Sequence, residues 1–137
     1  MAMLDLMKSL TSPLNGTTAS IGLKMTTDPL FGKAKWRDTE LEKDFQARVT
    51  HLAKLYHWQC YAVPDSRRAS LAGFPDLTLW NVGQQRLIFA ELKREKGRLS
   101  ESQKVVLSEL QQLSKCEVYI WRPSDFDDII DILKGNK

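Results

Sequence analysis

The fold of this chain is decided by residues 73–93, which read GFPDLTLWNVGQQRLIFAELK. Two segments rich in aliphatic and aromatic residues flank NVGQQ, a run of turn-forming and polar residues, and this pattern predicts a β-hairpin. The expected strands are residues 76–80 and 86–93. Each strand carries charge in an otherwise apolar setting, because Asp76 opens the first while Glu91 and Lys93 lie near the end of the second.

Strand geometry predicts that these three charges lie close together. Side chains two residues apart on a strand share a face, so Glu91 and Lys93 should point the same way, with Cα atoms about 6.7 Å apart. Antiparallel pairing around the turn brings Asp76 to the same end of the sheet. One interpretation is a set of solvated strand ends, with Glu91 and Lys93 as a weak ion pair.

The alternative interpretation is a metal site. Two carboxylates at one sheet end repel each other, and burying them without compensation is costly. Mg²⁺ (or Mn²⁺) would offset that cost, because it prefers carboxylate, water and phosphate oxygens as ligands. Lys93 could orient or deprotonate an attacking water, or stabilise phosphate charge. Asp76, Glu91 and Lys93 would then serve metal-assisted phosphodiester hydrolysis.

Apolar periodicity and turn residues predict the remaining elements. In chain order they are a helix at 39–57 with Thr39 as N-cap, a strand at 58–63, a helix capped by Ser100 and running to about residue 114, a strand at 117–122, and a final helix capped by Ser124. A strand–helix–strand crossover normally makes its two strands parallel, so 86–93 and 117–122 should pair in parallel. The expected fold class is α/β, a small mixed sheet flanked by helices in the order α-β-β-β-α-β-α.

Composition limits the function only broadly. With 137 residues, 42% of them hydrophobic and 27% charged, the chain suits one ordinary domain. Residues 1–35 contain an uncharged turn-forming stretch and are expected to form a flexible arm before a domain at 36–137. No run of 18 apolar residues and no signal-peptide pattern occurs, so we expect no membrane partner and a cytoplasmic location.

Basic residues flank the charged hairpin in the sequence. Arg67 and Arg68 precede it, and Arg94, Lys96 and Arg98 follow it. Such a run is often only a solvated face. The net charge of +3 permits a nucleic-acid partner without demanding one. Because these residues lie on both sides of the proposed metal site in the sequence, we expect them to contact a nucleic-acid phosphate backbone.

The motifs resemble those of the PD-(D/E)XK nuclease superfamily, here as Pro75-Asp76 and Glu91-Leu92-Lys93. A longer series is similar to the VRR-NUC branch and covers roughly residues 39–123, with WRPSD at 121–125. That series consists of Glu42 three residues before Phe45-Gln46, then DSR, GFPD, ELK, GRLS and Gln103. The resemblance implies a restriction-endonuclease-like fold, with a VRR-NUC-like nuclease domain at 36–137.

The resemblance also implies residue roles. Asp76, Glu91 and the backbone carbonyl of Leu92 would be metal ligands, Glu42 would complete the metal site, and Lys93 would be the catalytic lysine. Gln103 would be the polar catalytic residue that follows the ELK strand. Thr39 with Glu42 and Ser100 with Gln103 also read as capping boxes, so structural and functional roles stay open at both positions.

The function that the resemblance implies is that of a Mg²⁺-dependent, structure-specific DNA endonuclease. Stand-alone members of this branch resemble phage-encoded junction resolvases, so a homodimer acting on branched DNA in recombination or DNA repair is the first expectation. A phage or prophage protein would act in the host cytoplasm. The alternatives are a flap or single-strand nuclease, and a catalytically silent DNA-binding module of the same fold.

Overall fold

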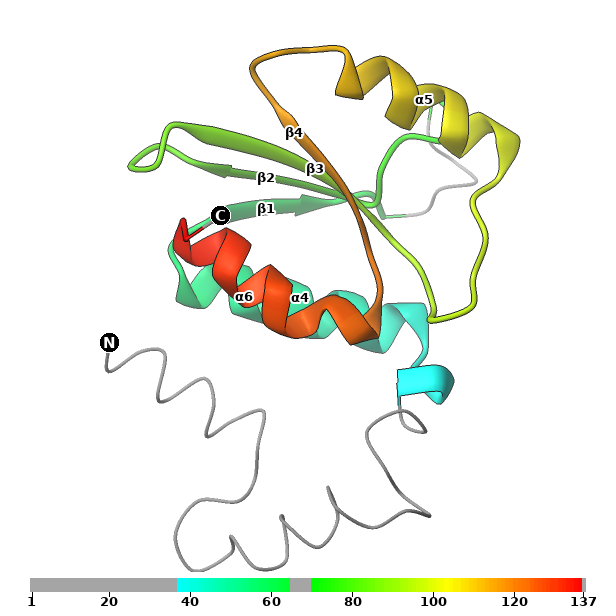
Figure 1. The fold of residues 1–137 in the computed structure, drawn as a ribbon, viewed down its shortest axis with the longest axis horizontal. Helices are drawn as coiled ribbons and strands as arrows, with labels where there is room; N and C mark the ends of the chain where they lie inside the picture. Colours follow the sequence, from blue (N-terminus) through cyan, green and yellow to red (C-terminus); the bar gives the residue numbers. More distant parts are fainter. Residues whose placement is uncertain (1–36, 65–69, 137) are drawn as a thin grey trace, which may run out of the picture. The chain divides into compact units, whose positions relative to one another are not determined.

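The computed structural model describes residues 37–64 and 70–136 (Figure 1). The expected arm at 1–35 and the loop arginines Arg67 and Arg68 lie outside the described residues. The chain divides into two compact units, residues 1–39 and 40–137. The second unit carries all of the helices and strands described below except a helical turn at 37–39.

The order of elements confirms the predicted α-β-β-β-α-β-α arrangement, with one short 3₁₀ turn added. The elements are α4 (Glu42–Leu55), β1 (Gln59–Ala62), β2 (Leu77–Asn81), β3 (Arg86–Leu92), α5 (Glu101–Gln111), β4 (Glu117–Trp121), η3 (Pro123–Asp125) and α6 (Phe126–Lys134). The strands form one sheet in the order β1-β2-β3-β4. The first three strands are antiparallel, and β3 pairs with β4 in parallel, as the crossover predicted.

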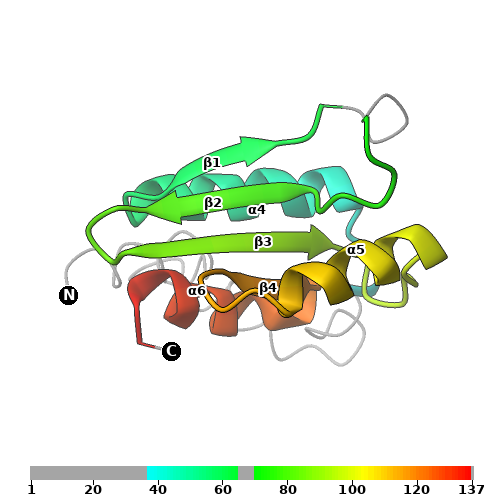
Figure 2. The ribbon, with the colours of Figure 1, turned by 90° about the horizontal axis from the view of Figure 1, so that it is seen from above.

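The sheet lies between two helical layers. Helices α4 and α6 cover one face, and α5 lies on the other (Figures 1 and 2). Arg86 of β3 reaches the carbonyl of Ile132 on α6, so its face of the strand is the one covered by α4 and α6. The core between these layers includes fully or almost fully buried residues from the helices and the sheet: Phe45, Val49, Leu52, Leu77, Leu79, Ile88, Ala90, Leu92, Ile129 and Leu133.

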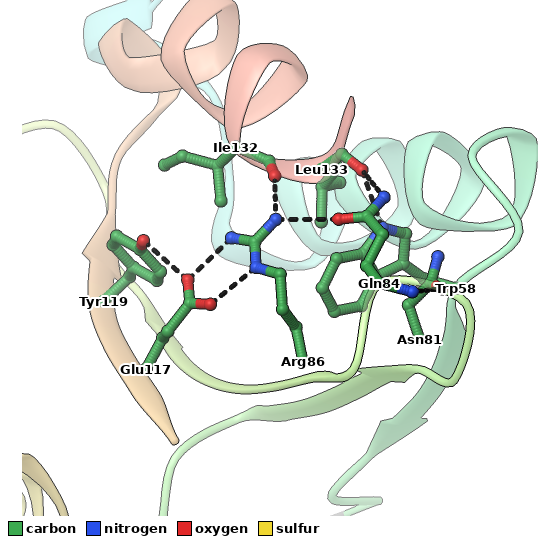
Figure 3. Close-up of polar contacts among 8 residues, drawn as sticks. All are labelled: Trp58, Asn81, Gln84, Arg86, Glu117, Tyr119, Ile132 and Leu133. Carbon is green, nitrogen blue, oxygen red and sulfur yellow. Dashed lines mark hydrogen bonds and ion pairs between the residues drawn. The ribbon is translucent and has the colours of Figure 1, made fainter. Parts of the chain in front are cut away.

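A polar network holds the turn of the β2–β3 hairpin against the end of α6 (Figure 3). The Arg86 guanidinium donates to both oxygens of Glu117, each at 2.6 Å, and to the Ile132 carbonyl at 2.7 Å. The side chains of Gln84 and Trp58 both donate to the Leu133 carbonyl. The Ile132 carbonyl also accepts from the Gly135 backbone N–H, so Arg86 adds a second donor to it. The side chains of Gln84, Arg86 and Trp58 thus tie this end of the sheet to the last turn of α6 as a structural cluster.

Two predicted helix caps are wrong. The N-cap of α4 is Leu41, without a side-chain cap, whereas Thr39 belongs to a separate helical turn at 37–39. Just before α4, Glu40 forms an ion pair with Arg48, which donates to both of its carboxylate oxygens at 2.8 and 2.9 Å. The start of α4 thus carries an ion pair between residues eight positions apart and lacks the capping box expected for Thr39 and Glu42.

The last helix also begins differently from the expectation. Ser124 lies inside η3 and is not a cap; the carboxylate of Asp125 accepts from the Arg122 backbone N–H at 2.8 Å. Pro123 favours this arrangement because its fixed φ and missing N–H suit the first position of a helical turn. The predicted cap at Ser100, in contrast, is confirmed.

Candidate active site

The three charged residues of the hairpin meet at the end of the sheet away from the turn. Asp76 immediately precedes β2, and the pairing of Leu77 with Ala90 places it opposite Glu91 when the register continues. An oxygen of the Asp76 carboxylate accepts from the backbone N–H of Leu92 at 2.9 Å. The Lys93 ammonium lies 3.0 Å from Oε1 of Glu91. The structure thus brings together the residues that strand alternation placed on one face.

Pro75 affects the backbone of Leu92. The N–H of Lys93 donates to the carbonyl of Trp121, the last residue of β4, so the backbone groups of Leu92 point the other way, towards β2. Continuing the β2–β3 register places Pro75 opposite Leu92, and proline has no N–H to donate to the Leu92 carbonyl. Pro75 therefore cannot pair with this carbonyl, which stays out of the β2 ladder.

Gln103 has both of the roles that the sequence left open. The side-chain oxygen of Gln103 accepts from the Ser100 backbone N–H at 2.9 Å. The backbone N–H of Gln103 donates to the Ser100 hydroxyl at 3.2 Å, which completes a capping box. Its side-chain nitrogen donates to Oε1 of Glu91 at 2.6 Å. One amide group thus caps α5 and orients a carboxylate of the site.

Gly73 is a residue of the site whose role sequence reasoning missed. Its φ of +87° suits glycine, and a Cβ there would lie 2.3 Å from the Ser102 carbonyl oxygen and 2.7 Å from the Gln103 nitrogen. The segment before Asp76 can therefore pack directly on the first turn of α5 only because residue 73 has no side chain. The signal was present in GFPD, as a glycine three residues before the aspartate, but nothing local showed what it contacts.

The carboxylates of the site are buried, and this changes their acidity. Glu91 is 1% exposed; burial, together with the charge of Asp76, raises its pKa to about 7, and Lys93 opposes the rise. Burial also raises the pKa of Asp76. The hydrogen bond from the Leu92 N–H and the charge of Lys93 lower this pKa, whereas the charge of Glu42 raises it further. Two carboxyl groups that resist ionisation side by side are typical of functional sites.

Glu42 lies at the edge of this group. It is the first residue of α4, its side chain is exposed, and within the described residues no hydrogen bond joins it to Asp76 or Glu91. Its effect on the pKa of Asp76 nevertheless shows that the two charges interact across the site. Glu42 could therefore approach a bound cation through water more readily than by direct contact.

The donor groups fit a hard divalent cation. Within residues 37–64 and 70–136, no group of three or more His, Cys, Asp and Glu is close enough to form a metal cluster. However, Oε2 of Glu91 is buried and has no hydrogen-bond partner in the described part of the chain. An unpaired buried carboxylate oxygen, a second carboxylate and a carbonyl kept out of the β2 ladder together suit Mg²⁺ or Mn²⁺, which keep several waters in their coordination shell.

The basic residues after β3 lie beside this site. Arg94, Lys96 and Arg98 all have exposed side chains and follow Lys93 within five positions. They are therefore placed where a substrate phosphate backbone reaching Lys93 could contact them, whereas Arg67 and Arg68 lie outside the described residues.

Across the described segments, none of the helices has the length and apolarity needed to cross a membrane.

Comparisons with known proteins agree with the motifs. Residues 37–122 match the VRR-NUC domain. A curated relative, the Fanconi-associated nuclease 1 homolog of Schizosaccharomyces pombe (strain 972 / ATCC 24843), is 41% identical over 47 residues. That match covers 34% of this chain and 7% of the relative, so the chain corresponds to a small part of that protein. No solved structure matches.

Proposed function

Because this chain belongs to the VRR-NUC family, as its motifs predicted, and resembles a curated nuclease, we propose that it is a metal-dependent nuclease that hydrolyses phosphodiester bonds in DNA. One observation carries the proposal: a buried Glu91–Lys93 ion pair lies beside the Asp76 carboxylate at the end of the sheet. A structural ion pair would not need a second carboxylate next to it, because the added charge only raises the cost of burial.

Asp76, Glu91 and the Leu92 carbonyl would hold the cation. A bound Mg²⁺ would polarise the substrate phosphate and offset its negative charge. Gln103 and Lys93 both contact Oε1 of Glu91, which leaves Oε2 as the oxygen that lacks a protein partner in the described residues. One oxygen of the Asp76 carboxylate likewise accepts a hydrogen bond, from the Leu92 backbone N–H. The protein therefore orients both carboxylates before any ligand binds, which favours precise placement.

Lys93 would act on the substrate side of this pair. It is 9% exposed, so its side chain is largely withdrawn from water but keeps a small exposed part. In that position it can donate to a phosphate oxygen as negative charge develops there, or orient a water for in-line attack. A charge held in a poorly hydrated place stabilises such a transition state more than a fully solvated one does.

The finer proposal is a structure-specific endonuclease that acts on branched DNA, similar to a Holliday-junction resolvase, in recombination or repair. A two-fold homodimer would present two sites to the two strands that such an enzyme cuts. The proposed setting is the cytoplasm, or the host cytoplasm for a phage protein. A flap or single-strand nuclease is the alternative enzyme, and a silent DNA-binding module is the alternative without catalysis.

The test uses purified protein with Mg²⁺ or Mn²⁺ and three labelled substrates: a four-way junction, a flap and a linear duplex. We expect Asp76→Ala and Lys93→Ala each to lower cleavage by about 100-fold or more, with folding and DNA affinity nearly unchanged. Lys104→Ala is the matched control, since Lys104 is an exposed lysine of α5 that pairs locally with Glu101.

Three outcomes separate the alternatives. Preferred cleavage of the junction would support the resolvase-like activity, and preferred cleavage of the flap would favour the flap nuclease. DNA binding by the wild type without cleavage of any substrate, in either metal, would favour the silent module. Cleavage by Asp76→Ala or Lys93→Ala at the wild-type rate would show that the active site has been assigned to the wrong residues.

A further inference from the structure

The basic turn, residues 94–98, is held at two points by residues 122–124, in and just before η3. An amino group of the Arg122 guanidinium donates to the Arg94 carbonyl at 3.0 Å. On the same side, the Glu95 carboxylate accepts from the Ser124 backbone N–H at 3.0 Å. Both contacts join residues that lie about 28 positions apart in the chain, so the turn is anchored by the tertiary fold.

The turn is also closed on itself and rests on Lys93. The Gly97 N–H donates to the Arg94 carbonyl at 2.9 Å, which is the hydrogen bond of a tight turn. A Cβ at Gly97 would lie 3.3 Å from the Arg94 nitrogen and 3.4 Å from Cδ of Lys93. The turn therefore folds back over the aliphatic part of the Lys93 side chain and borders the candidate active site.

Glu95 is out of place if the turn serves only as a patch of positive charge. A carboxylate among Arg94, Lys96 and Arg98 lowers the attraction of the turn for phosphate. Unlike these exposed basic side chains, Glu95 is half-buried, and its carboxylate is directed at a backbone N–H of η3. Its contact is thus with the protein scaffold.

We propose that Glu95 and Arg122 are positioning residues that fix the basic turn so that Arg94 and Arg98 contact the DNA phosphate backbone beside the active site. This inference rests on the proposed function. A turn that is already fixed loses little conformational freedom when DNA binds, whereas a loose turn must be ordered at the expense of affinity. The cost of one acidic residue near phosphate is then offset by the preorganisation that it provides.

Two substitutions at Glu95 separate positioning from charge. Glu95→Gln and Glu95→Ala remove the same negative charge, but only glutamine keeps a side-chain oxygen that can accept from the Ser124 N–H. If charge alone matters, both variants bind DNA equally and more tightly than the wild type. If Glu95 positions the turn, Glu95→Gln binds at least as tightly as the wild type, and Glu95→Ala binds roughly fivefold more weakly than Glu95→Gln.

The measurement is the Kd of each full-length protein for a fluorescent four-way junction and a linear duplex, with Ca²⁺ in place of Mg²⁺ to limit cleavage, over a range of NaCl concentrations. The slope of log Kd against log salt should fall by roughly 0.9 for each phosphate that Glu95→Ala no longer neutralises, and stay unchanged in Glu95→Gln. Glu101→Ala, at an exposed acid on α5 whose ion pair is local, controls for the loss of one negative charge.

Thermal unfolding of both variants provides the folding control, and similar Tm values are expected because Glu95 lies near the surface. Equal affinities and equal salt slopes for Glu95→Gln and Glu95→Ala, with wild-type binding intact, would overturn this inference alone. Failure of the wild type to bind either DNA would overturn the proposed function and this inference together.

Discussion

The charge of Glu91 is expected to make the folded protein less stable. Burial and the neighbouring Asp76 raise the pKa of Glu91 from an ordinary value of 4.5 to about 7. A difference of this size corresponds to about 3 kcal/mol of lost folding stability once the group is ionised in both states. Because Glu91 is almost fully buried, water screens little of this cost; the ion pair with Lys93 offsets part of it and is already included in the pKa.

The pH range of the effect follows from the two states. The unfolded chain releases the Glu91 proton near pH 4.5, and the folded protein holds it until about pH 7. Folding stability therefore falls as pH rises through this interval, because the folded state binds more protons than the unfolded state there. The penalty is absent below about pH 4.5 and complete above about pH 7.

Glu91→Gln tests this reasoning. The substitution keeps the size of the side chain and an oxygen that can accept from Gln103, but it removes the charge. In EDTA at pH 8 we expect the variant to be about 3 kcal/mol more stable than the wild type, because the part of the penalty that Lys93 offsets is already included in the pKa. Urea unfolding at pH 5, 6.5 and 8 measures the difference, which should shrink towards zero at the lowest pH.

The same substitution should abolish stabilisation by metal. A ligand that binds only the folded state at 100 times its Kd adds about 2.7 kcal/mol, so Mg²⁺ or Mn²⁺ should raise the Tm of the wild type but not that of Glu91→Gln. Glu101→Gln is the control, since its side chain is 89% exposed and should change neither quantity. A metal-free Glu91→Gln protein less stable than the wild type at pH 8, or a difference that does not vary with pH, would refute the reasoning.

Two further predictions concern how the fold supports the site. Gly73→Ala should destabilise the protein by about 2–5 kcal/mol, because alanine disfavours a φ of +87° and its Cβ would collide with the Ser102 carbonyl. As a control, Gly83→Ala in the hairpin turn should cost less than about 1 kcal/mol. Equal melting temperatures for the two variants would contradict this prediction. Arg86→Met should lower the free energy of unfolding in urea by roughly 2–3 kcal/mol. The reason is that Glu117 and the Ile132 carbonyl of α6 lose their guanidinium partner (Figure 3). A cost for Arg86→Met below about 0.5 kcal/mol would show that this network contributes little.

Sequence reasoning was most reliable where local geometry decides the outcome. Alternation along one strand and closure of one hairpin are sufficient to bring Glu91, Lys93 and Asp76 together. The capping box at Ser100 is equally local, because its two hydrogen bonds join residues three positions apart. The same reasoning was wrong at Thr39, where the local pattern was present but Leu41 is the N-cap of α4 and Glu40 pairs with Arg48 eight positions away.

The sequence by itself determined the order of elements, the parallel pairing of β3 with β4, and the meeting of three charges at one end of the sheet. Each of these follows from the period of two along a strand or from the handed crossover between strands. Only the tertiary structure decided that Gly73 packs on Ser102, that Gln103 reaches Glu91, and that Glu95 holds the basic turn through Ser124. These contacts join segments that are distant in the chain, and their geometry depends on how the helices pack on the sheet, which no local pattern of residues encodes.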